Sequence, residues 1–471
     1  MSDKSAPVAY DGGSFRDPAG FVFKYKNTIY RQVNSSGKAD FDYFVSSGLY
    51  DELAGLGLIV AHSEVELSNI PSDDKRYKLL KPTPVPFISY PYEWTFSQLK
   101  AAALLTLQIQ KIALSRGMIL KDASAYNVQF IGRRPVFIDS LSFRVYETGS
   151  PWDGYKQFCE HFISPLAVAS FGATDVIKMQ RAFIDGMPLS TAAKLLPARA
   201  KLSKGLMMHL YLHAAGQRKY NKSYDDAASA RAVSKLAMTG LIASLEKAIN
   251  KLKPAKQATQ WGDYYSGTNY SDAAFAAKKK IVGRLLAEVK PKPKNVWDIG
   301  ANDGTFSEIA ARSGAYVISF DFDPRTVELN FSRSRDPVLA DLILPLSQDL
   351  TNPSPALGWA HRERASLEAR GPADVILALA LVHHLAIGNN LPLAAIADFF
   401  SKLGRCLIIE FVPKHDSKTK LLLARRVNMF PEYSVDGFEA AFSKYFGVVK
   451  KVPVVGSQRV IYLLKSKKTF A

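Results

Sequence analysis

The feature that most constrains this chain is a mainly apolar strand that runs directly into a glycine turn and then into a helix. Residues 295–299 have the character of a buried strand, the next five read Gly-Ala-Asn-Asp-Gly, and a helical pattern follows over residues 305–313. In an open α/β sheet this arrangement places a ligand against the backbone amides of a helix N-terminus. Gly300 and Gly304 have no Cβ to hold the backbone away from a ligand, and Asn302 tolerates a left-handed conformation better than most residues. The turn alone has low specificity, and its continuation along the chain decides how it is interpreted.

The pattern continues as a regular alternation of strands and helices. A helix is expected over residues 272–289, and a second strand over residues 316–320 ends in Asp321. An acid at the tip of the second strand is placed to accept hydrogen bonds from both ribose hydroxyls of an adenosine. A third element ends at Asp341 and Leu342, where the carboxylate could accept a hydrogen bond from an adenine amino group.

Polar side chains also follow the later strands. A fourth strand, residues 374–381, leads into His383 and His384, and a fifth, residues 405–411, ends with Glu410 close to its tip. In an open α/β sheet the carboxyl ends of the parallel strands face the ligand. These side chains are therefore candidates for contact with a reacting molecule.

The order of these motifs resembles that of class I S-adenosylmethionine-dependent methyltransferases. The stretches VWDIGANDGTFSEIA, SFDFDP, LADL and DVILALALVHHL carry the resemblance, which covers about residues 261–465. The expected terminal strands, residues 447–455 and 459–464, resemble the closing hairpin of that fold, whose last strand is inserted antiparallel. The resemblance implies a Rossmann-like, seven-stranded α/β domain that binds S-adenosylmethionine through Asp298, Gly300, Ala301, Asn302, Gly304, Asp321, Phe322, Asp341 and Leu342.

Within that set the resemblance implies separate roles. The loop from Asp298 to Gly304 would cradle the methionine part of the cofactor, and Asp321 would hold the ribose. Phe322 would lie beside the adenine, and Asp341 would contact its edge.

A nicotinamide-binding Rossmann domain is the main alternative. Such a domain needs the spacing Gly-x-Gly-x-x-Gly, but Asn302 and Thr305 stand where the second and third glycines belong. The closing hairpin is also unexpected for that fold. Both differences favour the methyltransferase.

The catalytic residues are less constrained. Methyl transfer needs an aligned acceptor, and a base where the acceptor must lose a proton. His384, with His383 beside it, is the candidate base or acceptor-orienting residue; alternatively, one imidazole caps the next helix or donates to a backbone carbonyl. Glu410 is a weaker candidate. An aromatic cluster could form a lid or pack the linker against the sheet, and its members are Trp261, Tyr264, Tyr265 and Tyr270.

The N-terminal half carries a second motif series. Asp122, then Asn127, then two short strands ending in Asp139 resemble the catalytic and metal loops of the kinase-like fold. The resemblance implies that Asp122 orients an acceptor and that Asn127 and Asp139 bind magnesium. The usual glycine-rich loop is missing. Alternatively, Asp122 and Asn127 form a turn network and Asp139 caps a buried loop in a domain that recruits the substrate. Candidates for the phosphate-binding cation are Lys24, Lys26 and Arg31.

Composition divides the chain into three expected parts. Residues 1–150 mix strands with two helices and are the α+β kinase-like domain, and residues 151–255 are a helical extension of it. Residues 261–471 are the Rossmann-like domain, preceded by a linker rich in Lys, Pro, Gln and Ala over residues 251–260. A chain of 471 residues exceeds the size of one ordinary core.

Charge and cysteine content limit which partners and which cellular compartment are expected for the protein. The net charge of +18 permits an anionic partner such as RNA, but it is shared about equally by the two halves. The clusters Lys278–Lys280 and Lys465–Lys468 are typical of solvated faces. Two cysteines without metal-ligand spacing, and no apolar run long enough for a signal peptide or a membrane span, indicate a cytoplasmic protein without a zinc site.

The sequence therefore predicts a two-part methyltransferase. A large additional domain indicates an acceptor bigger than a free metabolite: a glycan, a lipid-linked glycan or a natural-product scaffold. The whole chain also resembles nodulation-type methyltransferases of rhizobia. The alternatives are a nucleic-acid methyltransferase, although no Asn/Asp-Pro-Pro-Tyr/Phe signature follows the fourth strand, and a bifunctional protein with an ATP-binding kinase-like domain.

Overall fold

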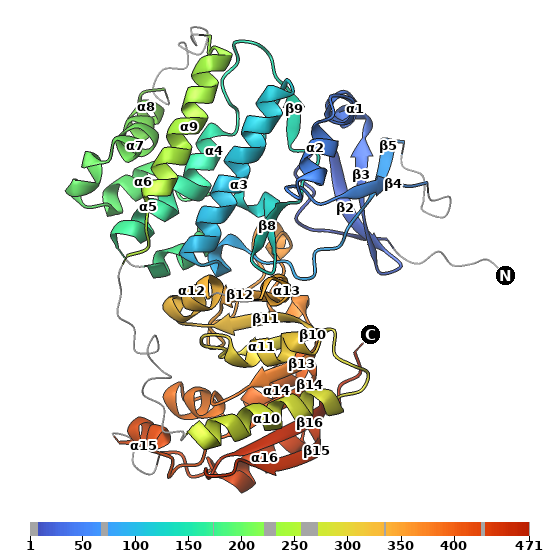
Figure 1. The fold of residues 1–471 in the computed structure, drawn as a ribbon, viewed down its shortest axis with the longest axis vertical. Coiled ribbons are helices and arrows are strands. Elements are labelled where there is room, and N and C mark those ends of the chain that lie inside the picture. The colour runs from blue at the N-terminus through green and yellow to red at the C-terminus, as the bar shows by residue number, and fades with distance from the viewer. Residues whose placement is uncertain are drawn as a thin grey trace, which may run out of the picture. The chain divides into compact units, whose positions relative to one another are not determined.

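The computed structural model describes residues 8–66, 74–172, 174–220, 232–255, 272–333, 336–424 and 429–470. The chain divides into two compact units (Figure 1). The first comprises residues 1–256 with residues 356–364, and the second comprises residues 257–355 with residues 365–471. In the described part of the chain, no helix combines the length and the apolar character needed to cross a membrane.

The first unit begins with a five-stranded antiparallel sheet of order β1-β2-β3-β5-β4. The chain then forms two short antiparallel pairs, β6 with β9 and β7 with β8. This confirms the expected α+β class. The strands are β1 (Ala9–Tyr10), β2 (Gly20–Tyr25), β3 (Thr28–Asn34), β4 (His62–Glu64), β5 (Arg76–Pro82), β6 (Met118–Leu120), β7 (Val128–Ile131), β8 (Arg134–Phe137) and β9 (Phe143–Val145).

Local sequence explains where two expected elements end early. The strand-like sequence of residues 77–90 forms a strand only as far as Pro82, because the alternate prolines from there to residue 86 lack the N–H that a sheet ladder needs. The helical pattern of residues 40–58 forms two helices, α1 (Lys38–Ser46) and α2 (Leu49–Gly55), because Gly48 between them adopts a left-handed φ of 75°.

Helix α3 (Phe96–Ser115) is the longest helix of this unit among the described residues. Its start is fixed by a capping box: Thr95 Oγ1 accepts from the amide of Gln98 at 3.1 Å, and the Gln98 side chain accepts from the amide of Thr95 at 2.9 Å. The mostly helical remainder comprises α4 (Tyr155–Phe158), α5 (Ser164–Phe171), α6 (Leu189–Leu195), α7 (Lys204–Leu206), α8 (His213–Tyr220) and α9 (Lys235–Lys251).

The second unit is a seven-stranded sheet of order β12-β11-β10-β13-β14-β16-β15. Neighbouring strands from β12 to β14 run parallel, and β16 is antiparallel to both β14 and β15. This is the expected methyltransferase fold, closed by the expected reversed strand. The strands are β10 (Asn295–Ile299), β11 (Tyr316–Asp321), β12 (Ile343–Ser347), β13 (Ala373–Ala378), β14 (Gly404–Phe411), β15 (Phe446–Pro453) and β16 (Val460–Ser466).

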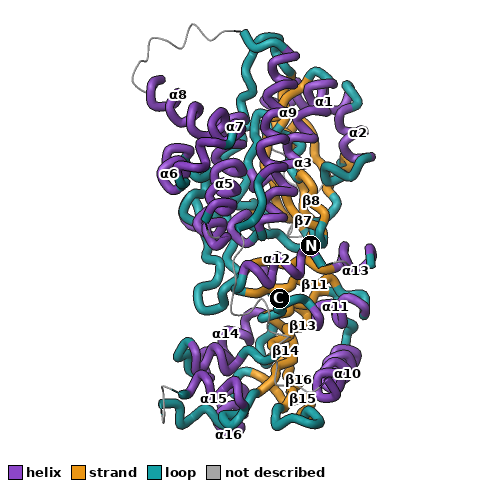
Figure 2. Tube along the Cα trace, turned by 60° about the vertical axis from the view of Figure 1, so that its left-hand side comes forward, coloured by secondary structure: helices purple, strands orange, loops and turns teal. Residues whose placement is uncertain are grey.

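Helices cover both faces of this sheet, which buries the apolar strands. Figure 2 shows α10, α11 and α13 on one side and α12, α14, α15 and α16 on the other. Their bounds are α10 (Asp272–Glu288), α11 (Thr305–Arg312), α12 (Pro324–Ser332), α13 (Pro337–Leu342), α14 (Leu393–Leu403), α15 (Ser417–Leu423) and α16 (Val435–Ser443).

The third strand does not lie where the sequence placed it. Asp341 and Leu342 belong to helix α13, which begins at Pro337 with the Asp336 side chain accepting from the amide of Val338 at 2.9 Å. Strand β12 starts only at Ile343. The third element expected to end at Asp341 and Leu342 is therefore a helix, and Asp341 lies before the third strand and not after it.

Residues 356–364 leave the second unit and form part of the first, an excursion that no sequence pattern indicated. The buried carboxylate of Glu363 pairs with the Arg16 guanidinium at 2.6 Å. The Arg364 guanidinium stacks over the ring of Tyr126, 3.9 Å from its centroid. A Cβ on Gly12 would lie 2.0 Å from the carbonyl oxygen of Arg362, so this packing requires a glycine there.

Candidate active site

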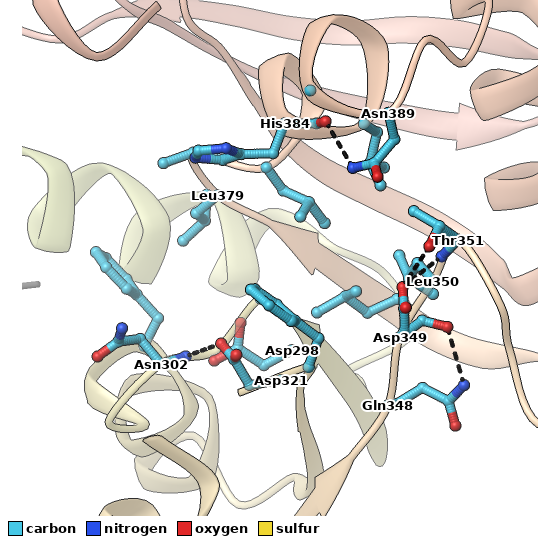
Figure 3. Close-up of a pocket in the computed structure, with 18 of the residues that line it drawn as sticks. Asp298, Asn302, Asp321, Gln348, Asp349, Leu350, Thr351, Leu379, His384 and Asn389 are labelled. Carbon is cyan, nitrogen blue, oxygen red and sulfur yellow. Dashed lines mark hydrogen bonds between the residues drawn. The ribbon is translucent and has the colours of Figure 1, made fainter. Parts of the chain in front are cut away.

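The second unit contains a cavity of about 380 Å³ lined by the segments that follow strands β10, β11, β12 and β13 (Figure 3). Helix α10 and the first turn of α11 complete the lining. The volume lies in the range typical of small-molecule sites. Of the expected cofactor residues, Asp298, Gly300, Asn302, Asp321 and Phe322 line this cavity.

The glycine turn adopts the backbone that its residue types permit. Gly300, Asn302 and Gly304 have φ values of 76°, 51° and 82°, so Asn302 does adopt the left-handed conformation. The amides of Gly300 and Ala301 both donate to the carbonyl of Phe320, at 2.9 and 3.0 Å. These bonds attach the turn to the end of β11.

Asp321 joins the turn to the second strand. Its Oδ2 accepts from the amide of Asn302 at 2.9 Å (Figure 3). Its Oδ1 accepts from the amide of Asp323 at 3.0 Å. Burial raises the pKa of Asp321, and the two backbone hydrogen bonds oppose that rise. The carboxylate is thus held in place, and its remaining lone pairs can accept from a ligand in the cavity.

Asp298 is buried beneath the turn. Its Oδ2 accepts from the Ser307 hydroxyl at 2.6 Å, and Ser307 in turn is 2.8 Å from the hydroxyl of Ser319. Burial raises the pKa of Asp298 to about 7, and the negative charge of Asp321 adds to this effect. The cavity therefore contains two buried acids, an environment that suits a cationic ligand.

The segment after β12 replaces Asp341 and Leu342 in the lining. Gln348, Asp349, Leu350 and Thr351 line the cavity, whereas Asp341 and Leu342 are not among its lining residues. Asp349 Oδ1 accepts from both the amide and the hydroxyl of Thr351, at 2.8 and 2.7 Å. The sequence contains Asp-Leu twice within ten residues, at 341 and at 349, and the strand that separates them decides which pair reaches the site.

The two candidate histidines differ in position. His384 lines the cavity, and its carbonyl accepts from the Asn389 side chain at 3.0 Å (Figure 3). His383 is fully buried outside the lining, and neither of its ring nitrogens has a hydrogen-bond partner among the described residues. Burial lowers the pKa of His384 to about 4, and the charges of Arg459 and Lys418 lower it further. Its ring is therefore neutral near pH 7.

Glu410, a weaker catalytic candidate, and Lys278, expected in a solvated cluster, form an ion pair in the structure. The Lys278 ammonium donates to Glu410 Oε2 at 2.6 Å, and both side chains are buried. The interpretation of Lys278 as part of a solvated cluster is therefore wrong, although Lys279 and Lys280 are exposed. Glu410 does not line the cavity, but Lys278 does. The aromatic cluster of Trp261, Tyr264, Tyr265 and Tyr270 lies outside the described residues.

The candidate magnesium residues of the first unit are engaged with protein groups. Asp139 pairs with Arg31 through Oδ1 and accepts from the Ser142 hydroxyl through Oδ2 at 2.7 Å. Asn127 donates to that same hydroxyl at 3.1 Å, and Asp122 accepts from the amide of Ser124 at 2.9 Å.

The charges in this network agree with a structural role. Burial alone would raise the pKa of Asp139, but the Arg31 guanidinium and the Ser142 hydrogen bond outweigh it and hold that pKa below its ordinary value. Over the described ranges, no group of three His, Cys, Asp or Glu side chains is arranged to hold a metal ion. In this structure the three residues take part in the turn network and loop cap, and their role toward magnesium stays a prediction.

Comparison with solved structures gives only distant matches. The N-methyltransferase NodS from Bradyrhizobium japonicum WM9 is 12% identical with a TM-score of 0.30, covering 42% of this chain and 99% of that chain. Magnesium protoporphyrin IX methyltransferase from Synechocystis PCC 6803 is 18% identical with a TM-score of 0.32, covering 43% and 92%. The bifunctional kinase-methyltransferase WbdD is 15% identical with a TM-score of 0.28, covering 47% and 46%. Matches this distant carry no weight, and the fold assignment depends on the strand order.

Comparison of sequences is more informative. No family model matches the chain. Nodulation protein NoeA of Rhizobium meliloti (strain 1021) is 38% identical over 461 residues, which cover 96% of this chain and 94% of that protein. With this identity over nearly the full length of both proteins, the chain belongs to the family of nodulation protein NoeA.

Proposed function

We propose that this chain is an S-adenosylmethionine-dependent methyltransferase whose second unit binds the cofactor in the cavity beside β10 to β13. One observation carries the proposal. The left-handed turn at Gly300–Gly304 and the buried acid Asp321 line the same cavity, in a sheet with the strand order and the single reversed strand of a methyltransferase. The residues present fit the cofactor: a turn open to close approach, an acceptor for ribose hydroxyls and a strongly acidic interior.

Each part of the cofactor has a candidate partner. Asp321 would accept from the ribose hydroxyls, and Phe322, whose side chain is 49% exposed, would lie against the adenine. Asp349 would take the role expected of Asp341 and accept from the adenine amino group, since it follows β12 and lines the cavity. The turn from Asp298 to Gly304 would enclose the methionine part.

The bound cofactor supplies an electrophilic methyl group on a sulfonium. The chain must align an acceptor with it and exclude water. His384 lines the cavity and, being neutral near pH 7, can accept a hydrogen bond or a proton from an acceptor hydroxyl or amine. Its low pKa makes it a weak base, so orientation of the acceptor is its main proposed role.

The proposed acceptor is a glycan or lipid-linked glycan made for nodulation. The name of the NoeA relative supports the biological context. An additional unit of more than 250 residues, far larger than the cofactor requires, supports a large acceptor.

A transfer assay tests this proposal. The full-length protein is incubated with methyl-labelled S-adenosylmethionine and with chitin oligosaccharides, N-acylated chitin oligosaccharides or RNA. We expect label in an oligosaccharide with the wild type and with Asp341→Asn, and much less label with Asp321→Asn at the same cofactor concentration. Label in RNA alone would favour the nucleic-acid alternative, and no label in any oligosaccharide would overturn the glycan acceptor.

A further inference from the structure

A row of four paired charges, three of them buried, lies beside the cavity of the second unit. The Lys278 ammonium donates to Glu410, the Arg459 guanidinium is 3.5 Å from the other oxygen of Glu410, and Arg459 Nε donates to Asp416 at 2.8 Å. Lys278, Glu410 and Arg459 have exposed fractions of 3%, 0% and 3%. Three charges removed from water in this way are costly unless each is paired, so the positions of these side chains are tightly specified.

Of these four charged residues, Lys278 lines the cavity. It lies on helix α10, and its ammonium is 4.9 Å from the ring centroid of Phe306, in the first turn of helix α11 after the glycine turn. Asp298, at the start of that turn, acts on Lys278 electrostatically. Lys278 is therefore close to the part of the cavity that the turn encloses.

The charges of the lining are unequal. Among the described residues that line the cavity, Asp298, Asp321 and Asp349 are acidic, and Lys278 is the single lysine or arginine. S-adenosylmethionine carries one carboxylate beside an ammonium and a sulfonium. The acids suit its two cationic groups and its hydroxyls, whereas its carboxylate needs a cation or free N–H donors.

We infer that Lys278 binds the α-carboxylate of the methionine moiety and that Glu410 is a positioning residue that holds the ammonium at the cavity wall. This inference rests on the proposed function. An ammonium group has three N–H donors, so Lys278 can donate to Glu410 and to a ligand carboxylate together. The Glu410 carboxylate, fixed between Lys278 and Arg459, limits the freedom of the lysine before the ligand arrives.

Two ligands that differ only in the carboxylate test this inference. S-adenosylhomocysteine has the carboxylate, and S-adenosyl-3-thiopropylamine lacks it but keeps the amine and the adenosine. Calorimetry on the full chain measures the affinity for both ligands. Lys278→Met should lower the affinity for S-adenosylhomocysteine at least tenfold and change the affinity for S-adenosyl-3-thiopropylamine less than threefold. Lys280→Met, an exposed lysine on the same helix, is the matched control and should change neither.

Folding needs its own control, because Lys278→Met leaves Glu410 buried without its lysine. The double variant Lys278→Met/Glu410→Gln removes both charges and should show the same selective loss. Lys278→Arg should recover part of the affinity for S-adenosylhomocysteine. In Glu410→Gln the lysine remains, so we expect an intermediate loss that is again confined to the ligand with the carboxylate.

The outcomes are separable. The role of Lys278 would be overturned if Lys278→Met and the double variant lowered the affinity for both ligands equally, or lowered the affinity for neither ligand. The proposed function would remain intact in both cases. A folded wild type that binds neither S-adenosylhomocysteine nor S-adenosylmethionine would overturn the proposed function itself.

Discussion

Asp321 is fixed by two backbone amides before any ligand is present, and this explains why one carboxylate can organise the site. The amide of Asn302 reaches it from the turn, and the amide of Asp323 reaches it from the chain beyond β11. A side chain that is already oriented loses little freedom when a ligand binds. In the proposed function, this acid would couple the shape of the turn to the binding of the ribose hydroxyls.

This arrangement makes a paired prediction. Asp321→Asn keeps the size of the side chain but removes a charged acceptor, so the affinity for S-adenosylhomocysteine should fall about tenfold or more, in line with roughly 1.5–3 kcal/mol for a hydrogen bond to a charged group. Asp341→Asn, on the exposed part of α13, should leave the affinity unchanged. Calorimetry measures both, and a larger loss for Asp341→Asn would restore the role that the sequence suggested for it.

Helices and strands with a strong hydrophobic periodicity could be predicted from the sequence, whereas the short third strand could not. The strands before and after the glycine turn, the helix α10 and the closing hairpin agree with their expected positions within a few residues. The third strand was placed too early because LADL and SQDL both end in Asp-Leu. The dipeptide Asp336-Pro337, a helix N-cap followed by proline at the first helical position, was the signal that residues 337–342 form a helix.

The buried lysine was also detectable in principle. Ala274, Lys278, Ile281, Val282 and Leu285 follow helical spacing and are all buried, so Lys278 is on the apolar face of α10. A run of three lysines is typical of a solvated surface, and only the helical spacing of its apolar neighbours distinguishes Lys278 from Lys279 and Lys280. Its partner Glu410 is more than a hundred residues away, and no local pattern connects the two.

The excursion of residues 356–364 gives a prediction for an element. Gly12→Ala would place a methyl group 2.0 Å from the carbonyl oxygen of Arg362, so the segment must shift away from the β1–β2 turn. We expect faster tryptic cleavage after Arg362, which is already exposed. Gly55→Ala, where an added Cβ meets nothing within 4 Å, is the control. Unchanged cleavage in Gly12→Ala would contradict the packing of this segment.

The whole molecule should lose stability in acid. Burial lowers the pKa of six histidines: to about 4 for His62, His209 and His384, to about 3 for His161, and below its ordinary value also for His213 and His383. Because the unfolded chain takes up these protons near pH 6.5 and the folded chain does not, stability is full above that pH and falls toward pH 4. Acids whose pKa values burial raises have the opposite effect, and they are Asp298, Asp17, Asp122, Glu160 and Asp321. These five sites oppose the six histidines.

Thermal unfolding at pH 7.5 and pH 5.0 measures this effect, and the Tm should be lower at pH 5.0. His161→Phe removes one of the six histidines and should reduce the difference in Tm between the two pH values. A Tm that is equal or higher at pH 5.0 would show that the buried histidines are not neutral in the folded protein.

The central claim is that the cavity of the second unit binds an adenosyl sulfonium compound. Calorimetric titration of the pure, full-length protein with S-adenosylmethionine, S-adenosylhomocysteine and NADH tests it most directly. We expect one site per chain for each of the first two ligands and no uptake of NADH. Binding of NADH without binding of either adenosyl compound would contradict the account.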